Sequence, residues 1–236
     1  QSTEGKHFKM TADITLPDNW QPIGCTKDGT NNIDKGANLN AFSGILDGNN
    51  KLLTVPKGGL PLLGYIKGAT VKNLNIYGEQ IDGYGLVNNF EGVGLSGSAI
   101  VIDNVTLKSG SKTLKSGLIG ANITTNGFAG CSAGFVATIR NCTIEKGVVV
   151  GYTGTESFIG SIAGRLQGTV ENCVSYATVK GVNQVGGIIG ARDNAVGDCK
   201  VIGCSFGGEV IGSGLNAGGI MGAMYIGGGA PNASRV

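Results

Sequence analysis

Charged side chains are scarce in this sequence. Asp, Glu, Lys and Arg together make up 14% of its 236 residues, and the formal net charge is +2. Proteins that bind nucleic acids or anionic membranes carry clusters of basic residues, so we expect no nucleic-acid partner. Apolar runs of about 18 residues, the length needed to cross a bilayer as a helix, are also absent. We therefore expect no membrane span in this segment.

The residues of common catalytic and metal sites are equally sparse. Histidine occurs once, at His7, and no C-x-x-C spacing occurs, so a Ser-His-Asp site would have to use His7 and a zinc site is not expected. Asp47, Gly48 and Asn49 are explained better by a turn than by a calcium site. We expect no cofactor and no metal. Glycoside cleavage needs two carboxylates about 5–9.5 Å apart, and the weak catalytic candidates are the close acidic pair Asp193 and Asp198.

Amphipathic helical patterns are missing as well, whereas glycine is abundant. The sequence has 44 glycines spread among short runs of Val and Ile. Such a composition is typical of many short strands joined by tight turns. Without helical crossovers, these strands are predicted to be parallel and wound as a coil.

A short sequence motif, the asparagine phrase, recurs along the chain and supports this prediction. When the phrases are aligned, four asparagines and one glycine occupy the same position, at spacings of 31, 37, 31 and 31 residues: Asn73, Asn104, Asn141, Asn172 and Gly203. Two positions earlier every residue is β-branched, and one position later every residue is apolar. A fixed period of this size indicates a solenoid. We predict an all-β, single-stranded parallel β-helix, right-handed as parallel crossovers are, with 1–57 as N-terminal cap and first turn and 58–236 as repeats.

The residue before each asparagine predicts a charge pattern. It is successively Lys72, Asp103, Arg140, Glu171 and Ile202. Stacked turns would place these side chains in an outer column of alternating sign, which penalises a shifted register.

The asparagines themselves are predicted to be structural. Apolar positions before and after each one are three residues apart, so strict alternation along the strand requires a bend there. We expect their side chains to form an inward, hydrogen-bonded ladder. The alternative is that Asn is present only because it tolerates turn geometry.

Six cysteines raise the question of disulfides. Residues one turn apart stack at about 4.8 Å with parallel Cβ directions, whereas a disulfide needs its Cβ atoms about 3.8 Å apart. Cys142, Cys173 and Cys204 are thus predicted to form a column of buried structural thiols. For Cys25, Cys131 and Cys199, including a Cys199–Cys204 bridge, the question stays open.

A second, glycine-rich phrase alternates with the first, as in 85–88, 117–120, 161–164, 187–190 and 219–222. The segments between the phrases vary in length, at about 89–99, 121–137, 148–158 and 191–198. Variable insertions on a constant scaffold commonly carry binding surfaces.

Several phrases together resemble a known family. Residues 10–16, 20–24, 42–49, 62–64 and 71–74 are similar to the opening of bacterial GLUG-motif β-helix proteins, and the later Gly-Ile-Ile-Gly to Asn-Cys alternation resembles the GLUG repeats. The resemblance covers about 8–226 and implies a secreted or cell-surface protein. Some members belong to adhesins or to surface proteases with separate catalytic domains. This chain departs from the family in having cysteine in a repeat column.

These observations predict a non-catalytic extracellular module that acts in adhesion or in binding glycans or host-surface proteins. A carbohydrate-active enzyme is one alternative and a structural spacer is another. The weak candidates for rings that stack on sugars are Trp20, Tyr84, Tyr152 and Tyr225. The sequence starts without Met and stops just after a repeat phrase, so we expect further domains in a longer protein.

Overall fold

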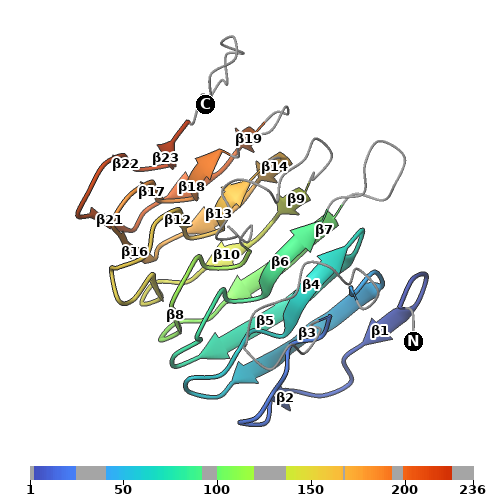
Figure 1. The fold of residues 1–236 in the computed structure, drawn as a ribbon. Helices are drawn as coiled ribbons and strands as arrows, with labels where there is room; N and C mark the ends of the chain where they lie inside the picture. The colour runs from blue at the N-terminus through green and yellow to red at the C-terminus, as the bar shows by residue number, and fades with distance from the viewer. Residues whose placement is uncertain are drawn as a thin grey trace.

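The computed structural model describes residues 3–24, 41–91, 100–119, 137–166, 168–192 and 199–224. In these ranges the chain forms strands and turns without a helix, and all of its strand pairs are parallel. The strands lie side by side along one direction, with β1 near one end and β23 near the other (Figure 1). The predictions of an all-β chain and of parallel strands are confirmed.

The largest sheet has eleven strands. Its main path runs β1-β3-β5-β7-β10-β15-β20, while β2 pairs with β3 and the path β7-β9-β14-β19 continues the other half of the sheet. The strands are β1 (His7–Lys9), β2 (Ile14–Thr15), β3 (Ile45–Val55), β5 (Thr70–Gly78), β7 (Ile100–Leu107), β9 (Ala137–Arg140), β10 (Thr143–Ile144), β14 (Gly168–Glu171), β15 (Val174–Ser175), β19 (Cys199–Ile202) and β20 (Ser205–Phe206).

Four smaller sheets follow the same direction. One contains β8 (Lys112–Thr113), β11 (Val149–Val150), β16 (Thr178–Gly181) and β21 (Glu209–Gly212). The second contains β12 (Ile159–Gly160), β17 (Val185–Gly186) and β22 (Ala217–Gly218). The third contains β13 (Ala163–Leu166), β18 (Ile189–Arg192) and β23 (Met221–Ala223), and the last pairs β4 (Leu63–Lys67) with β6 (Val87–Glu91). Single bridges through Ile119 connect β6 to β13.

Each strand pairs with the equivalent strand of the next repeat, so equivalent residues form continuous columns. The clearest is an inward apolar column: Phe8, Leu46, Val71, Ile102, Ile139, Val170 and Val201. Its middle members are fully buried in the hydrophobic core. Burial of a Val or Ile side chain contributes about 1.5–3 kcal/mol, so these columns are the main source of stability.

The predicted bend at the asparagines is confirmed. Asn73, Asn104, Asn141 and Asn172 have φ between 52° and 55°, and Gly203 has φ 61°. These are left-handed conformations, which Asn and Gly adopt more readily than other residues. The bend turns the residue that follows it back into the core.

Residues 47–50 behave differently from the turn that their sequence predicts. They lie within the single strand β3, and both halves of β3 pair with β5. The register shifts between Asp47 and Lys51, where Asn49 and Asn50 have positive φ. The extra residues are thus a β-bulge at the position of the asparagine bend, since a hairpin would have made the following strand antiparallel.

Glycines in the second phrase or directly before it have a specific role in packing. Strands β12 and β17 lie so close to β18 and β23 that their backbones nearly touch. A Cβ on Gly160 would lie 2.6 Å from the Gly190 nitrogen, and one on Gly186 would lie 2.6 Å from the Gly222 nitrogen. None of these four glycines has positive φ, so it is space that requires glycine here. We call Gly160, Gly186, Gly190 and Gly222 the glycine seam.

The cysteine column forms, and the predicted burial is confirmed for Cys142 and Cys173 but not for Cys204. Cys142 and Cys173 are buried, Cys204 is half-buried, and all three are free thiols. The backbone N–H groups of Cys142 and Cys173 each donate a hydrogen bond to the sulfur of the next cysteine in the column, at 3.4 Å. Cys199 is also a buried free thiol, so it forms no bridge with Cys204. Cys25 and Cys131 lie outside the described residues.

Candidate functional site

Polar side chains form a regular column on the outer face of the eleven-stranded sheet. The predicted charge pattern is in register from Lys72 through Ile202. The structure extends it by two residues that the repeat alignment missed, Lys9 and Asp47. We call the resulting six residues of alternating sign the outer charge column: Lys9, Asp47, Lys72, Asp103, Arg140 and Glu171.

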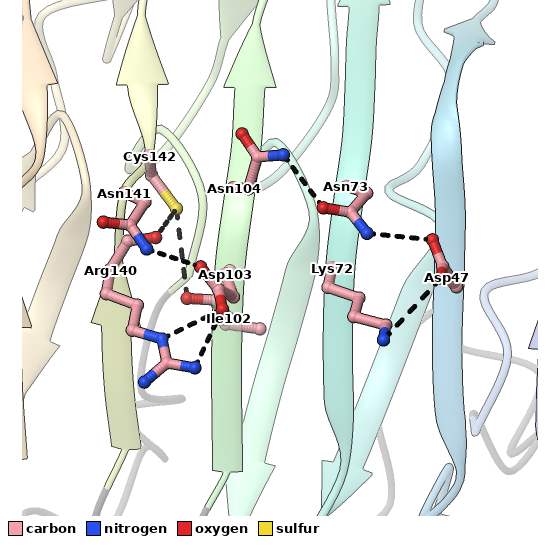
Figure 2. A network of polar contacts seen from close by, with 9 residues as sticks. All are labelled: Asp47, Lys72, Asn73, Ile102, Asp103, Asn104, Arg140, Asn141 and Cys142. Carbon is pink, nitrogen blue, oxygen red and sulfur yellow. Dashed lines mark hydrogen bonds and ion pairs between the residues drawn. The ribbon is translucent and has the colours of Figure 1, made fainter.

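Ion pairs join neighbouring members of this column (Figure 2). Lys72 Nζ lies 3.7 Å from Asp47 Oδ2. Arg140 donates from both Nε and Nη2 to Asp103 Oδ2, each at 2.9 Å. These side chains are partly exposed, so each pair is expected to contribute only about 0–1 kcal/mol.

The asparagine side chains connect to the same column. Asn73 Nδ2 donates to Asp47 Oδ1 at 3.1 Å, Asn104 Nδ2 to Asn73 Oδ1 at 2.9 Å, and Asn141 Nδ2 to Asp103 Oδ1 at 2.8 Å (Figure 2). Asn104 and Asn141 are exposed, as is Asn172. The prediction of an inward ladder is therefore wrong. The left-handed backbone directs the Asn73 and Asn141 amides toward outer carboxylates, and the hydrogen bond between the Asn104 and Asn73 side chains is on the surface.

These contacts hold the Asp47 carboxylate in its ionised form. The backbone N–H of Asn49 and the Asn73 amide keep the pKa of Asp47 below its usual value, with a smaller contribution from Lys72. The hydrogen bond to Asp103 raises the pKa of Arg140. A general acid in glycoside cleavage needs a raised pKa, so Asp47 is unsuited to that role.

The thiols of the cysteine column have low reactivity. Contact with the Cys142 thiol raises the pKa of Cys173 to about 12, and burial raises that of Cys199 to about 11. Contact with Cys173, followed by burial, also raises the pKa of Cys204. Thiolate is the reactive form of cysteine, so these residues are structural thiols.

The predicted ligand-binding rings that are described are all half-buried. Trp20 packs against the core, and its indole N–H donates to the Pro61 carbonyl at 3.2 Å. Lys115 Nζ lies 5.9 Å from the centroid of the Tyr84 ring, and burial raises the pKa of Tyr84. These contacts position Trp20 and Tyr84 as packing residues.

Tyr152 belongs to a small polar cluster. Its hydroxyl donates to Asp82 Oδ1 at 3.3 Å and accepts from Gln80 Nε2 at 3.0 Å. Burial and the nearby Asp82 carboxylate raise the pKa of Tyr152. The cluster brings an aromatic ring, an amide and a carboxylate together, but its groups satisfy one another.

Tyr176 was missed by the sequence prediction. At 48% exposure it is the most exposed aromatic side chain in the described ranges. Its ring lies over Gly207, where a Cβ would come 3.0 Å from Tyr176 Cδ1. Glu145, one repeat earlier, pairs with Lys108 and accepts a hydrogen bond from the Ser109 N–H at 2.9 Å. The 31-residue spacing of Glu145, Tyr176 and Gly207 could have revealed this arrangement.

The remaining candidates, Asp193, Asp198 and Tyr225, lie outside the described residues.

In the described part of the chain, no group of three His, Cys, Asp or Glu side chains could hold a metal ion. No helix long and apolar enough to cross a membrane occurs in the same ranges. Comparisons of the whole chain with protein-family models, curated proteins and solved structures gave no match.

Proposed function

We propose that the parallel sheets are the faces of one right-handed β-helix, with 1–57 as its end unit, and that the chain is related to GLUG-motif proteins. The proposal is supported by the advance of one repeat between strand partners in every sheet with three or more strands. The glycine seam supports it too, because it gives the repeated Gly phrase a physical role.

On this scaffold, the function that the geometry supports best is non-catalytic binding at a cell surface, with glycans as the ligand class. The observation that carries this function is the exposed Tyr176 ring beside the paired Lys108 and Glu145. An exposed aromatic ring can pack on the C–H face of a sugar, while neighbouring charged groups bind its hydroxyls. An extracellular location and attachment to further domains are parts of the same proposal.

The charged groups of this face favour binding over catalysis. Asp47 and Asp103 each accept hydrogen bonds from an asparagine amide and pair with a cation. Glu145 is held by Lys108 and by a backbone N–H. A retaining or inverting glycosidase needs one acid protonated and one free to attack or to activate water. Pairing of this kind disfavours both roles.

A glycan array read with the purified chain tests the proposal. We expect binding that the Tyr176→Ala variant loses about tenfold or more, because stacking of an aromatic ring is removed. Tyr77→Ala is the matched control, since Tyr77 lies three repeats earlier but is half-buried. Equal loss in both variants would exclude Tyr176 as the specific binding ring.

Incubation of the array glycans with the chain separates the other functions. Release of sugar products, abolished in an Asp193→Asn variant, would replace the proposal with a carbohydrate-active enzyme. Absence of both binding and release would leave a structural spacer.

A further inference from the structure

The corner that carries Tyr176 is shorter than the corner of the repeat before it. Four residues, 145–148, connect β10 to β11, whereas only Tyr176 and Ala177 connect β15 to β16, the strands with which β10 and β11 pair. One repeat earlier the corner again has four residues, 108–111, and one repeat later it again has two, 207–208. Tyr176 therefore lies where long corners are followed by short ones.

The additional length of the long corners is directed outward. The strands on both sides of each corner stay paired in register, so the extra residues are not taken up within the sheets. Each long corner closes as a turn in which the N–H of its last residue donates to the carbonyl of its first residue. The residues inside these turns, 109–110 and 146–147, are exposed. The corner 145–148 thus forms a raised edge beside Tyr176.

On the opposite side of Tyr176 the surface is low. Gly207 and Gly208 have no side chains, and the Tyr176 ring lies over Gly207. Described strands flank the strand before Tyr176 in both directions, so its exposure arises from these corners and not from a missing repeat. We call Tyr176, Gly207 and Gly208, bounded by the raised edge 145–148, the Tyr176 ledge.

The two sides of the Tyr176 ledge differ in charge. Glu145 of the raised edge is neutralised by Lys108. Lys146, in the exposed turn of the same edge, has no ion-pair partner in the part of the chain that the structure describes. Glu209, directly after the two glycines, likewise has none among the described residues. The ledge therefore has an uncompensated ammonium on its closed side and an uncompensated carboxylate on its open side.

We propose that the Tyr176 ledge binds the end of a glycan chain whose last sugar carries an anionic group, a carboxylate or a sulfate. The inference rests on the proposed glycan binding and specifies its ligand. The C–H face of the last sugar packs on the Tyr176 ring, and its anionic group accepts a charge-assisted hydrogen bond from Lys146. The raised edge blocks a further sugar on that side, so a chain end fits and an internal sugar does not.

The remainder of the glycan leaves over Gly207 and Gly208, where no side chain obstructs it. Its hydroxyls can donate to the Glu209 carboxylate, whereas a second anionic sugar at this position would be repelled by the same group. The ledge therefore favours a neutral chain with one anionic group at its end over a chain that is anionic throughout.

A glycan array with matched ligands tests the inference. Each set contains one neutral chain in three forms: ending in the anionic sugar, ending in its neutral counterpart, and carrying the anionic sugar inside the chain. Carboxylated and sulfated sugars form separate sets, which distinguishes the two anions. We expect the anionic end to bind about tenfold or more tightly than the other forms, because the neutral end lacks the hydrogen bond to Lys146 and the internal sugar meets the raised edge.

Two variants separate the charge of the edge from its height. Lys146→Gln should lose the preference for the anionic over the neutral end, whereas Lys6→Gln, at an exposed lysine just before β1, should keep it. Deletion of 146–147, which gives this corner the length of 176–177, should in addition remove the preference for an end over an internal sugar. Circular dichroism verifies that the deletion variant is folded. If it is not, the comparison of terminal and internal sugars on the unchanged chain decides this point.

The outcomes distinguish this inference from the proposal on which it rests. The inference alone is overturned if binding that depends on Tyr176 is as strong for neutral as for anionic ends, or as strong for internal as for terminal sugars. A preference for anionic ends that Lys146→Gln retains would also overturn it and leave glycan binding in place. Absence of binding to any glycan would overturn both.

Discussion

At both the glycine seam and the asparagine bends the backbone restricts which residue can be present, but the physical reason differs. At the seam, glycine is required because the backbone of another strand lies where a Cβ would be, although φ is ordinary. At the bends, φ between 52° and 55° is the constraint, and the asparagine side chains have room to reach the outer carboxylates. A substitution at the seam should therefore lower the free energy of unfolding through a steric clash. A substitution at the bends should lower it only through backbone strain.

The largest effect is expected from Gly190→Ala. A Cβ there would lie 2.5 Å from the nitrogen of Ile159 and from the carbonyl carbon of Phe158, and backbone atoms cannot move aside as a flexible side chain can. We expect a loss of about 3 kcal/mol or more in unfolding free energy, measured by urea denaturation. Gly219→Ala, in the equivalent phrase, meets nothing within 4 Å and should be nearly neutral. Similar losses in both variants would contradict the role of the seam.

A moderate effect is expected from Asn104→Ala. A left-handed conformation costs an ordinary residue about 1–2 kcal/mol, and Asn104 has φ 54° on an exposed surface. Asn104→Gly is the control, because it also removes the amide that donates to Asn73 but accepts positive φ without strain. The difference in denaturation midpoint between the two variants measures the backbone contribution. If the two variants are destabilised equally, the lost side-chain hydrogen bond, and not backbone strain, accounts for the effect.

A smaller effect is expected from protonation of Asp47. Its pKa is lower in the folded chain because the Asn49 N–H and the Asn73 amide bind the charged form. The contribution to stability is therefore complete above the pKa of the unfolded chain, about 4, and is lost as pH falls through the lower folded value. Asp47→Asn should lose less stability on acidification than the unchanged chain. Parallel pH profiles of unfolding free energy for the two proteins would contradict this expectation.

The smallest effect is expected within the outer charge column. Arg140→Ala removes an exposed ion pair with Asp103 and should cost about 1 kcal/mol or less, decreasing further as salt is added. A double-mutant cycle with Asp103→Ala isolates the coupling energy of the pair. A coupling energy as large as the cost of Gly190→Ala would reverse the ranking of the two regions.

The repeat spacing alone allowed much of the fold to be predicted. It identified the register of the outer charge column from Lys72 onward, the bend at the asparagines and the stacked free cysteines. These features depend on residues one repeat away, and in a periodic sequence the repeat length identifies which residues those are. Phe8, the first member of the inward apolar column, was not recognised, because the first repeat lacks the asparagine phrase that anchors the alignment.

The candidate site was predictable only in part. The aromatic candidates were chosen by residue type, and the exposure of Tyr176 depends on Gly207 one repeat later. The inward asparagine ladder was wrong because alternation along a strand does not give the direction of a side chain at a residue with positive φ. Asp47 was missed because a bulge with two extra residues replaces the single bend in β3. Lys9 was missed because its strand, β1, carries no asparagine phrase.

The sequence by itself determined which residues are equivalent from one repeat to the next, since period and residue type are local properties of the chain. Only the tertiary structure decided how closely the strands of different sheets approach, which made glycine obligatory at the seam. It also decided which side chains are exposed, Tyr176 among them, because exposure depends on the residues of neighbouring repeats. Burial and close approach depend on atoms far away in sequence, and no single repeat contains that information.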